Sequence, residues 1–309
     1  MNRKIALAIT ADGEVDLIRG MVDLLAPKLD RVLIVEGRRT FRGKPREVLG
    51  AGWMDLLALK PEQFRSIITE LPADNAPGGS MRQREMFQRN AIGLGVRDMQ
   101  ADDLLIAVDA DEFVDPAWLD AHADSVRVPT RLRMLPFYGG LDRRAPDWHC
   151  CLGHLSIPVG QWPPHETGWL CQGGVVGPIG ELANLGVQYW RSHPVAQTGE
   201  AAGWHLLHVL SPEKDPSWKL QRQAHDWDTG MDHQYMVRHL AAGIHPYGWW
   251  GATQISIPSQ LEFLARRLPD SVLGKLPSLN ERHQLMQAAL ERFHQYSNLT
   301  HSSINPEQI

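Results

Sequence analysis

Three short apolar runs in the first part of the chain have the pattern of buried β-strands. They are Lys4–Thr10, Arg31–Glu36 and Leu104–Val108. Uninterrupted apolar runs of this length, bounded by polar residues, are typical of strands covered on both faces, as in a parallel sheet. Between the first two runs, residues 15–29 place apolar side chains three and four positions apart, which predicts an amphipathic helix. The chain therefore opens with a predicted β-α-β unit and parallel strand pairing.

Weaker patterns predict the elements that follow. Ser80 and Gln83 match a capping box and predict a helix to about Arg97, with Phe87, Ala91 and Leu94 as its buried stripe. Residues 139–186 are rich in Gly, Pro and Trp and predict no clear element. Further strands are expected at 66–71, 127–137, 187–191 and 204–210, and helices after a second capping box at 259–262 and at 280–296. The predicted fold class is α/β, with a mostly parallel central sheet flanked by helices and a loop-rich, partly helical C-terminal part.

Composition narrows the class of protein. The chain has 309 residues, 43% of them hydrophobic, and a formal net charge of −5, which does not suggest a nucleic-acid partner. Three cysteines make no disulfide framework, and no apolar run approaches the ~18 residues of a membrane span. We expect a cytoplasmic protein with a main domain at 1–245, divided into an ordered half at 1–137 and a loop-rich half at 138–245. A helical extension with a flexible tail is expected at 246–309.

Three carboxylates follow the third apolar run within four residues. Asp109, Asp111 and Glu112 would emerge at the carboxyl end of the strand, where open α/β sheets bind their ligands. Carboxylates this close repel one another unless a cation joins them, and oxygen ligands favour Mg²⁺ or Mn²⁺. Asp111 is the first choice for direct metal contact and Asp109 is expected to reach metal or ribose. Glu112 would either bind the metal or orient the other two.

Three stretches of the chain resemble a known family when they are taken in order and spacing. They are Val35–Pro45, then Glu85–Asn90 with Asp102–Glu112, then Gly203–Leu206 with Lys219 and His225-Asp226. Over roughly residues 1–245 the sequence resembles glycosyltransferase family 17, the group related to β-1,4-mannosyl-glycoprotein N-acetylglucosaminyltransferase, and the wider GT-A type. It departs from the family at Phe113, where isoleucine is usual, and at Asp226 and Asp228, where a glutamate is usual.

The resemblance implies a metal-dependent, inverting glycosyltransferase, in which residues 1–137 would bind the donor and residues 138–245 would form the acceptor side. The donor would be a nucleoside-diphosphate sugar, first of all UDP-N-acetylglucosamine, and the acceptor a hydroxyl of a glycan, a protein, a small molecule or a modified nucleobase. His205 would complete the Mn²⁺ or Mg²⁺ site, with His225 as the second choice. The base that takes the acceptor proton would be Asp226, Asp228 or Glu166, of which Asp226 is favoured.

Residues near predicted strand and helix ends are candidates for contacts with the donor. Thr10, Asp12 and Glu36 would lie beside the nucleoside, while Arg89 and Asn90 would hold the diphosphate or ribose. Arg89 has an alternative, since it could pair with Glu85 one turn earlier on its helix. The basic loop at 37–46 is either a solvated loop or a patch near the donor phosphates.

Other functions stay open at this point. The acidic triplet could be a solvated turn, and His205 could be an ordinary core histidine. A sugar nucleotidyltransferase also uses carboxylate-bound metal, although such enzymes commonly have a basic loop after the first strand, where this chain reads Thr10-Ala-Asp-Gly-Glu14. A non-catalytic carbohydrate-binding protein would fit the eleven tryptophans.

Overall fold

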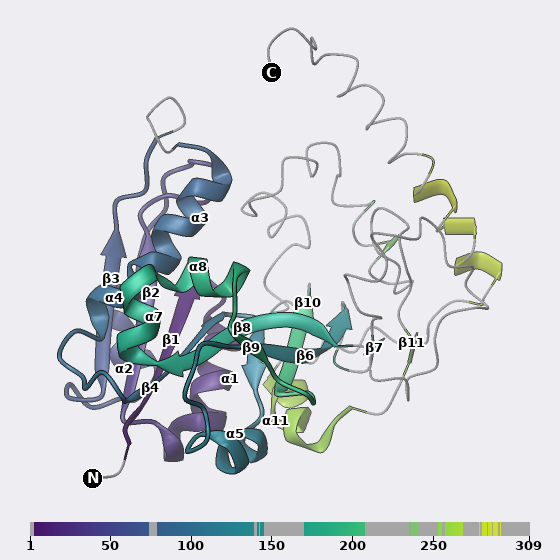
Figure 1. Cartoon of the computed structure of the whole chain (residues 1–309). Coiled ribbons are helices and arrows are strands. Elements are labelled where there is room, and N and C mark those ends of the chain that lie inside the picture. The colour runs from purple at the N-terminus through teal and green to yellow at the C-terminus, as the bar shows by residue number, and fades with distance from the viewer. Residues whose placement is uncertain are drawn as a thin grey trace, which may run out of the picture.

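A computed structural model describes residues 3–73, 79–138, 170–207 and 257–267, together with short pieces at 141, 143–144, 235, 238–239, 253–254 and between 278 and 291. Its centre is a mixed sheet whose long strands lie in the order β3-β2-β1-β4-β8-β6 (Figure 1). These strands are β1 (Ile5–Ala11), β2 (Arg31–Gly37), β3 (Phe64–Thr69), β4 (Leu104–Asp109), β6 (Thr130–Tyr138) and β8 (Cys171–Pro178).

The pairing of the long strands confirms the predicted sheet. β1 pairs in parallel with β2 and β4, and β2 pairs in parallel with β3. β8 is antiparallel to both β4 and β6, so β6 has the same direction as β4. The sheet is therefore mostly parallel, with one antiparallel strand inserted between β4 and β6.

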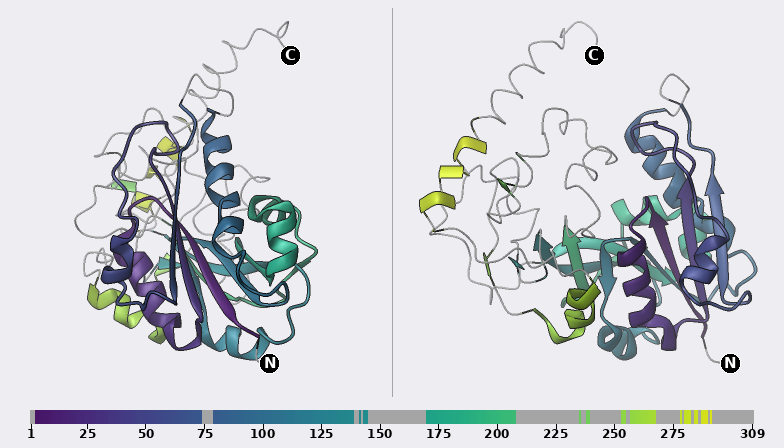
Figure 2. Two further views of the ribbon diagram at one scale, coloured as in Figure 1. Left: turned by 90° about the vertical axis from the view of Figure 1, so that its left-hand side faces the viewer. Right: turned by 180° about the vertical axis from the view of Figure 1, so that it is seen from behind.

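Helices cover both faces of this sheet (Figure 2). One face packs against α1 (Val15–Leu25), and the other against α3 (Met81–Asn90), α4 (Ile92–Gly95), α7 (Ile179–Leu185) and α8 (Val187–Ser192). Alternate residues of each strand enter the two cores, as the period of a β-strand requires: Leu7 and Ile9 face α1, whereas Ala6 and Ala8 face α4. The predicted α/β class with a sheet flanked by helices is thus confirmed.

Shorter elements complete the described part of the chain. β5 (Glu112–Val114) pairs antiparallel with β10 (Gly203–Leu207), which in turn runs parallel to β6. This arrangement brings the residues just after β4 next to the predicted late histidine. The remaining elements are η1 (Ala26–Lys28), α2 (Gly52–Leu56), α5 (Pro116–His122), β7 (Arg143–Arg144), β9 (Ala196–Gln197), β11 (Thr253–Gln254), η5 (Ser259–Leu261) and α11 (Glu262–Arg267).

The helix α3 begins as predicted but buries a different face. Ser80 and Gln83 form the capping box. However, Phe87 is 51% exposed, while Arg84 and Gln88 are only 1% and 2% exposed. Gln88 donates to the carbonyls of Ala11 and Val35, at the carboxyl ends of β1 and β2, and buried polar groups of this kind are retained when they are hydrogen-bonded. Of the predicted stripe Phe87, Ala91 and Leu94, only Ala91 is buried.

Two further predictions of local structure are wrong. Residues 187–191, expected as a strand, belong to the helix α8. Gly186, with φ of 86°, separates α8 from α7, and the side-chain oxygen of Asn90 accepts the Gln188 N–H in the first turn of α8. The second capping box does not form, because the Ser259 hydroxyl contacts Gln260 instead. A capping box does join Ser278 to Glu281, and the described residues between 280 and 291 are helical.

The predicted C-terminal extension contributes to the main core. Leu264 of α11 packs against α1, where a Cβ at Gly20 would lie 2.5 Å from its methyl group. Leu261 and Leu264 are fully buried in the same core as β1 and β4. The proposed domain boundary at residue 245 lies outside the described residues. Within the described part of the chain, no helix is long and apolar enough to cross a membrane.

Candidate functional site

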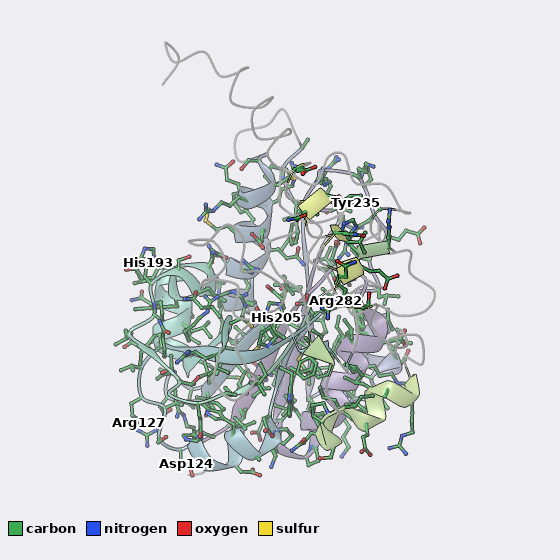
Figure 3. The ribbon with its side chains drawn as sticks, turned by 90° about the vertical axis from the view of Figure 1, so that its right-hand side faces the viewer. Asp124, Arg127, His193, His205, Tyr235 and Arg282 are labelled. Atoms are coloured by element: carbon green, nitrogen blue, oxygen red, sulfur yellow. The ribbon has the colours of Figure 1, made fainter. Side chains whose placement is uncertain are left out.

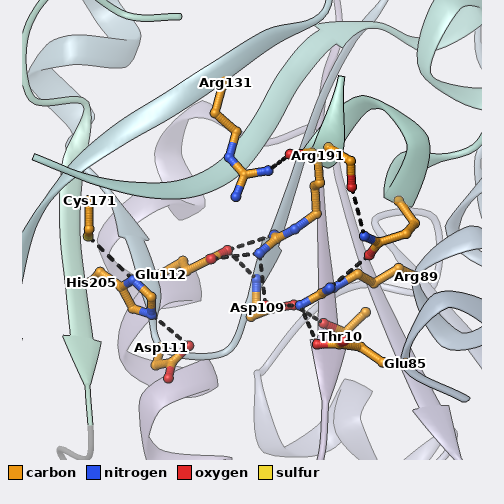
Figure 4. Close-up of polar contacts among 12 residues, drawn as sticks. Thr10, Glu85, Arg89, Asp109, Asp111, Glu112, Arg131, Cys171, Arg191 and His205 are labelled. Carbon is orange, nitrogen blue, oxygen red and sulfur yellow. Dashed lines mark hydrogen bonds and ion pairs between the residues drawn. The ribbon is translucent and has the colours of Figure 1, made fainter. Parts of the chain in front are cut away.

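The carboxylates predicted from the sequence lie at the carboxyl end of β4. In the strand register Thr10 of β1 stands beside Asp109 of β4, and its hydroxyl donates to Asp109 Oδ1 over 2.6 Å. The chain then turns through Ala110 and Asp111 and continues as β5 at Glu112. This places all three carboxylates at the edge of the parallel sheet where α/β proteins bind ligands. Their partners differ, however, and divide them into two groups (Figure 4).

Asp109 is held by two arginines from different helices. Arg89 of α3 donates through Nε to Oδ1 over 3.2 Å and through Nη2 to Oδ2 over 2.5 Å. Arg191 of α8 donates through Nη2 to Oδ2 over 2.9 Å. Arg89 also pairs with Glu85 over 2.9 Å, so the helix pairing considered from the sequence and the contact with the strand both occur. A diphosphate contact by Arg89 would have to share this guanidinium with two carboxylates.

Glu112 is turned inward and is 1% exposed. Arg191 donates to both of its oxygens, with Nη1 2.8 Å from Oε2 and Nη2 2.7 Å from Oε1. The backbone N–H of Asp109 donates to Oε2 over 2.8 Å. Three donors on a fully buried carboxylate favour the second of the two roles expected for Glu112, that of orienting its neighbours rather than binding metal.

We call Asp109, Glu112, Arg89, Arg191 and Arg131 the buried ion cluster. Burial alone would raise the pKa of Asp109, but Arg191 and Arg89 outweigh it and hold this pKa far below its usual value of 3.8. Burial likewise opposes the charge of Arg191, yet Asp109 and Glu112 raise its pKa above its usual value. Arg131, whose side chain donates to the Arg191 carbonyl, has its pKa lowered to about 10 by burial and by the charge of Arg191. Asp109, Glu112, Arg89 and Arg191 are thus ionised and paired with one another, while Arg131 contacts the cluster through the Arg191 carbonyl.

Asp111 points away from this cluster toward His205 of β10. Asp111 Oδ1 lies 3.7 Å from His205 Nε2, and the two side chains keep exposed fractions of 13% and 17%. The backbone supports the pair, since Leu206 N donates to the carbonyl of Asp111 over 2.7 Å. On its other side, His205 Nδ1 lies 3.5 Å from the sulfur of Cys171. In Figure 3 His205 is labelled near the middle of the view, away from the peripheral Asp124, Arg127 and His193.

The Asp111–His205 pair has the chemistry of part of a metal site. A distance of 3.7 Å is too long for a direct hydrogen bond, but metal–ligand distances of about 2.0–2.2 Å allow one cation to contact both atoms. Among the described residues, no three His, Cys, Asp or Glu side chains gather in a group that could hold a metal ion. The predicted set of Asp109, Asp111, Glu112 and His205 is therefore not brought together as four ligands. Two protein ligands do fit Mg²⁺ or Mn²⁺, which complete their coordination with water and substrate phosphates.

The carboxylates predicted beside the nucleoside serve the loop after β2. Glu36 is 2% exposed and accepts the N–H groups of Leu49 and Gly50 over 3.3 and 2.8 Å. Arg46 of the basic loop donates to Asp12 Oδ1 over 2.7 Å and to the Ala11 carbonyl over 2.8 Å. Arg46 Nε also donates to the Gly37 carbonyl over 2.6 Å, so this side chain joins the ends of β1 and β2. In this structure the carboxylate of Glu36 stabilises the loop, and its contact with a nucleoside stays a prediction.

Replacing Glu36 with alanine is expected to destabilise the protein without weakening nucleotide binding. The buried N–H of Gly50 and the part-buried N–H of Leu49 lose their acceptor, which costs about 1–3 kcal/mol of unfolding free energy. Urea denaturation and calorimetric titration with UDP would measure the two effects separately. A loss of nucleotide affinity with unchanged stability would restore the nucleoside role of Glu36. Glu47→Ala, an exposed glutamate of the same loop, is the matched control.

Several candidates lie outside the described residues. They are Glu166, Asp226, Asp228 and His225. Conversely, sequence patterns gave no sign of Arg191, Arg131 or Cys171, which supply the long-range contacts of the site. Asn90, expected on the donor, binds the Gln188 N–H, and Arg89 Nη1 binds the Gln188 side-chain oxygen over 2.8 Å. Gln188 therefore links α3 to α8 beside Asp109.

Comparison with known proteins gives similarity in structure only. No family model and no curated protein sequence matches the chain. A 4-diphosphocytidyl-2C-methyl-D-erythritol synthase structure shares 12% identity, covers 77% of this chain and 99% of its own, and has a TM-score of 0.36. The galactosyltransferase LgtC in complex with donor and acceptor sugar analogs shares 12% sequence identity. The match covers 61% of this chain and 64% of LgtC, with a TM-score of 0.33. Glucosyl-3-phosphoglycerate synthase from Mycobacterium tuberculosis, in complex with Mn²⁺, UDP and phosphoglyceric acid, shares 10% sequence identity. The match covers 83% of this chain and 89% of the synthase, with a TM-score of 0.33. At these values the function has to be argued from the residues of the site.

Proposed function

We propose that this protein is a cytoplasmic, metal-dependent, inverting glycosyltransferase of the GT-A type, related to family 17. It would transfer a sugar, first of all N-acetylglucosamine, from a UDP donor to a hydroxyl acceptor. The observation that carries the proposal is the Asp111–His205 pair at the carboxyl edge of the parallel strands. A carboxylate and an imidazole at this edge suit a cation that is shared with the phosphates of a nucleotide.

The chain divides the work between the pair and the buried ion cluster. Asp111 and His205 would hold Mn²⁺ or Mg²⁺, and such a cation supplies positive charge that stabilises the departing nucleoside diphosphate. Asp109 and Glu112 fix the turn that carries Asp111, because Arg191 binds both and Glu112 accepts the Asp109 N–H. The turn, fixed in this way, would keep Asp111 in one orientation before the donor binds. Charges that are already oriented stabilise a transition state most, because they need no rearrangement during the reaction.

Inversion at the sugar carbon needs a base on the acceptor side. Asp226 is our first proposal for this base, followed by Asp228 and Glu166, and all three lie outside the described residues. A carboxylate in this role removes the proton of the acceptor hydroxyl as the new bond forms. Thr10 and Asp12, at the end of β1, would lie beside the bound nucleoside.

A thermal-shift panel tests the donor and the metal together. UDP, GDP, CDP and ADP are each added with and without Mn²⁺ to the wild type and to Asp111→Ala. A ligand that binds only the folded state raises the melting temperature. At a ligand concentration 100 times the dissociation constant, the added free energy of unfolding is about 2.7 kcal/mol. We expect a Mn²⁺-dependent rise with UDP in the wild type and its loss in Asp111→Ala.

Other outcomes would contradict this proposal in different ways. No rise with any nucleotide would overturn it and favour a carbohydrate-binding protein. A second panel compares UDP-N-acetylglucosamine with a nucleoside triphosphate plus a sugar phosphate, and a larger rise with the second pair would favour the nucleotidyltransferase. Asp102→Ala, which removes an exposed carboxylate just before β4, controls for general effects of losing a charge.

A further inference from the structure

The side of His205 that faces away from Asp111 is in contact with a buried thiol. Cys171, at the start of β8, is 3% exposed, and its sulfur lies 3.5 Å from His205 Nδ1. The same thiol donates to the backbone carbonyl of Met134 over 3.3 Å. Met134 and Cys171 are register partners in the β6–β8 pairing, so the position of the sulfur is set by the sheet.

The direction of these contacts decides where the imidazole carries its proton. A thiol has one hydrogen, and the Met134 carbonyl, which can only accept, lies 3.3 Å from the sulfur. When the thiol donates to that carbonyl, the sulfur meets Nδ1 as an acceptor and Nδ1 carries the ring hydrogen. A neutral imidazole protonated at Nδ1 has its lone pair at Nε2, the atom 3.7 Å from Asp111.

We propose that Cys171 is a positioning residue that selects the Nδ1–H tautomer of His205 and aims Nε2 at Asp111. The metal-binding consequence rests on the function proposed above, whereas the choice of tautomer does not. Nitrogen ligands of metals are commonly oriented through a hydrogen bond from the other ring nitrogen, and a carboxylate or carbonyl is the usual acceptor. In this chain a thiol sulfur takes that place.

The packing around Cys171 leaves little freedom for this contact to change. A Cβ added at Gly173, two residues further along β8, would lie 2.3 Å from the sulfur of Met134, so the strand is pressed against β6. Leu170 and Cys171 are both buried. His205 is fixed from the opposite direction, since β10 pairs with β5 at Glu112 and with β6 at Pro136. The sulfur and the ring therefore keep their distance without a covalent link.

The first test reads the tautomer directly in metal-free protein. Side-chain ¹⁵N spectra of the histidines distinguish protonated from unprotonated ring nitrogens, and a His205→Gln sample identifies the His205 signals among the 14 histidines. We expect Nδ1–H in the wild type, the same tautomer in Cys171→Ser, whose hydroxyl can also accept, and a shift toward Nε2–H in Cys171→Ala. An Nε2–H tautomer in the wild type, or no change in Cys171→Ala, would overturn the proposal.

The second test follows the metal. Mn²⁺ binding, measured by electron paramagnetic resonance of the free ion, should weaken about tenfold or more in Cys171→Ala and return to within about threefold of wild type in Cys171→Ser. Val176→Ala, a buried change further along β8, should leave both the tautomer and the Mn²⁺ affinity unchanged despite its own loss of stability. A wild type that binds no Mn²⁺ would contradict the proposed function, while the tautomer measurement would still decide the role of Cys171. Equal Mn²⁺ affinity in the wild type, Cys171→Ala and Cys171→Ser would contradict that role.

Discussion

Asp111→Asn is expected to lower the rate of Mn²⁺-dependent sugar transfer by about 10²–10³-fold. The substitution keeps the shape of the side chain but removes the charge that would bind the cation opposite His205. A bound cation contributes several kcal/mol to stabilising a phosphate leaving group, and each 1.36 kcal/mol corresponds to about a tenfold change in rate. Release of UDP from a UDP-sugar, measured over a series of Mn²⁺ concentrations, would report the loss.

The matched control is Asp102→Asn, the same change at an exposed position before the same strand. It should leave the rate within about twofold of wild type, as expected for a surface change away from the site. Higher Mn²⁺ concentrations should recover part of the activity of Asp111→Asn if the defect is weakened metal binding. Full activity of Asp111→Asn at low Mn²⁺ would contradict the assignment of Asp111 as the metal ligand.

Arg191→Leu is expected to lower the free energy of unfolding by about 3–5 kcal/mol, because it leaves Glu112 buried without its cation. Arg191 is 8% exposed and donates to both oxygens of Glu112 and to Asp109. Removing one member of a buried pair costs more than removing both, since the remaining charge stays desolvated. Urea denaturation followed by circular dichroism would measure the change.

Two further variants separate the ion pair from general damage. Arg191→Leu combined with Glu112→Leu should recover part of the lost stability, and the difference between the double and single variants gives the coupling energy. Arg127→Leu removes an exposed arginine at the periphery of the molecule and should change stability by less than about 0.5 kcal/mol (Figure 3). A loss below about 1 kcal/mol in Arg191→Leu would show that the buried ion cluster relaxes without Arg191.

The strands that carry the site were predictable because their signal is local. β1, β2 and β4 are continuous apolar runs buried on both faces, and this pattern needs no knowledge of the partner strands. The position of the carboxylates followed directly, since they come immediately after one such run. β8 was not predicted, because Gly173 and Gly174 weaken the strand pattern. The structure explains these glycines: a Cβ at Gly174 would lie 2.4 Å from the Ala107 carbonyl of β4.

The partners of the carboxylates could not be predicted, because they come from distant parts of the chain. Arg191 lies 79 positions from Glu112, and nothing within residues 187–191 marks it as a buried cation. The same stretch was predicted as a strand, since valine, tyrosine and tryptophan favour strands when no tertiary contact is known. The prediction of which face of α3 is buried was wrong for a related reason. Arg84 and Gln88 are buried by hydrogen bonds to backbone carbonyls, which hydrophobic periodicity does not detect.

The antiparallel strand β8 has a consequence for how acceptor preference could diversify. Residues 145–170 connect β7, which pairs with β6, to β8, which also pairs with β6, so both ends of this segment are fixed in the sheet beside the same strand. Doubling the length of a connection between fixed ends costs only about 0.6 kcal/mol in chain entropy. Such a segment can be lengthened, shortened or exchanged between related proteins while Asp111, His205 and Cys171 stay in place. Exchange of this one segment would then change acceptor recognition without altering the half of the protein that would bind the donor.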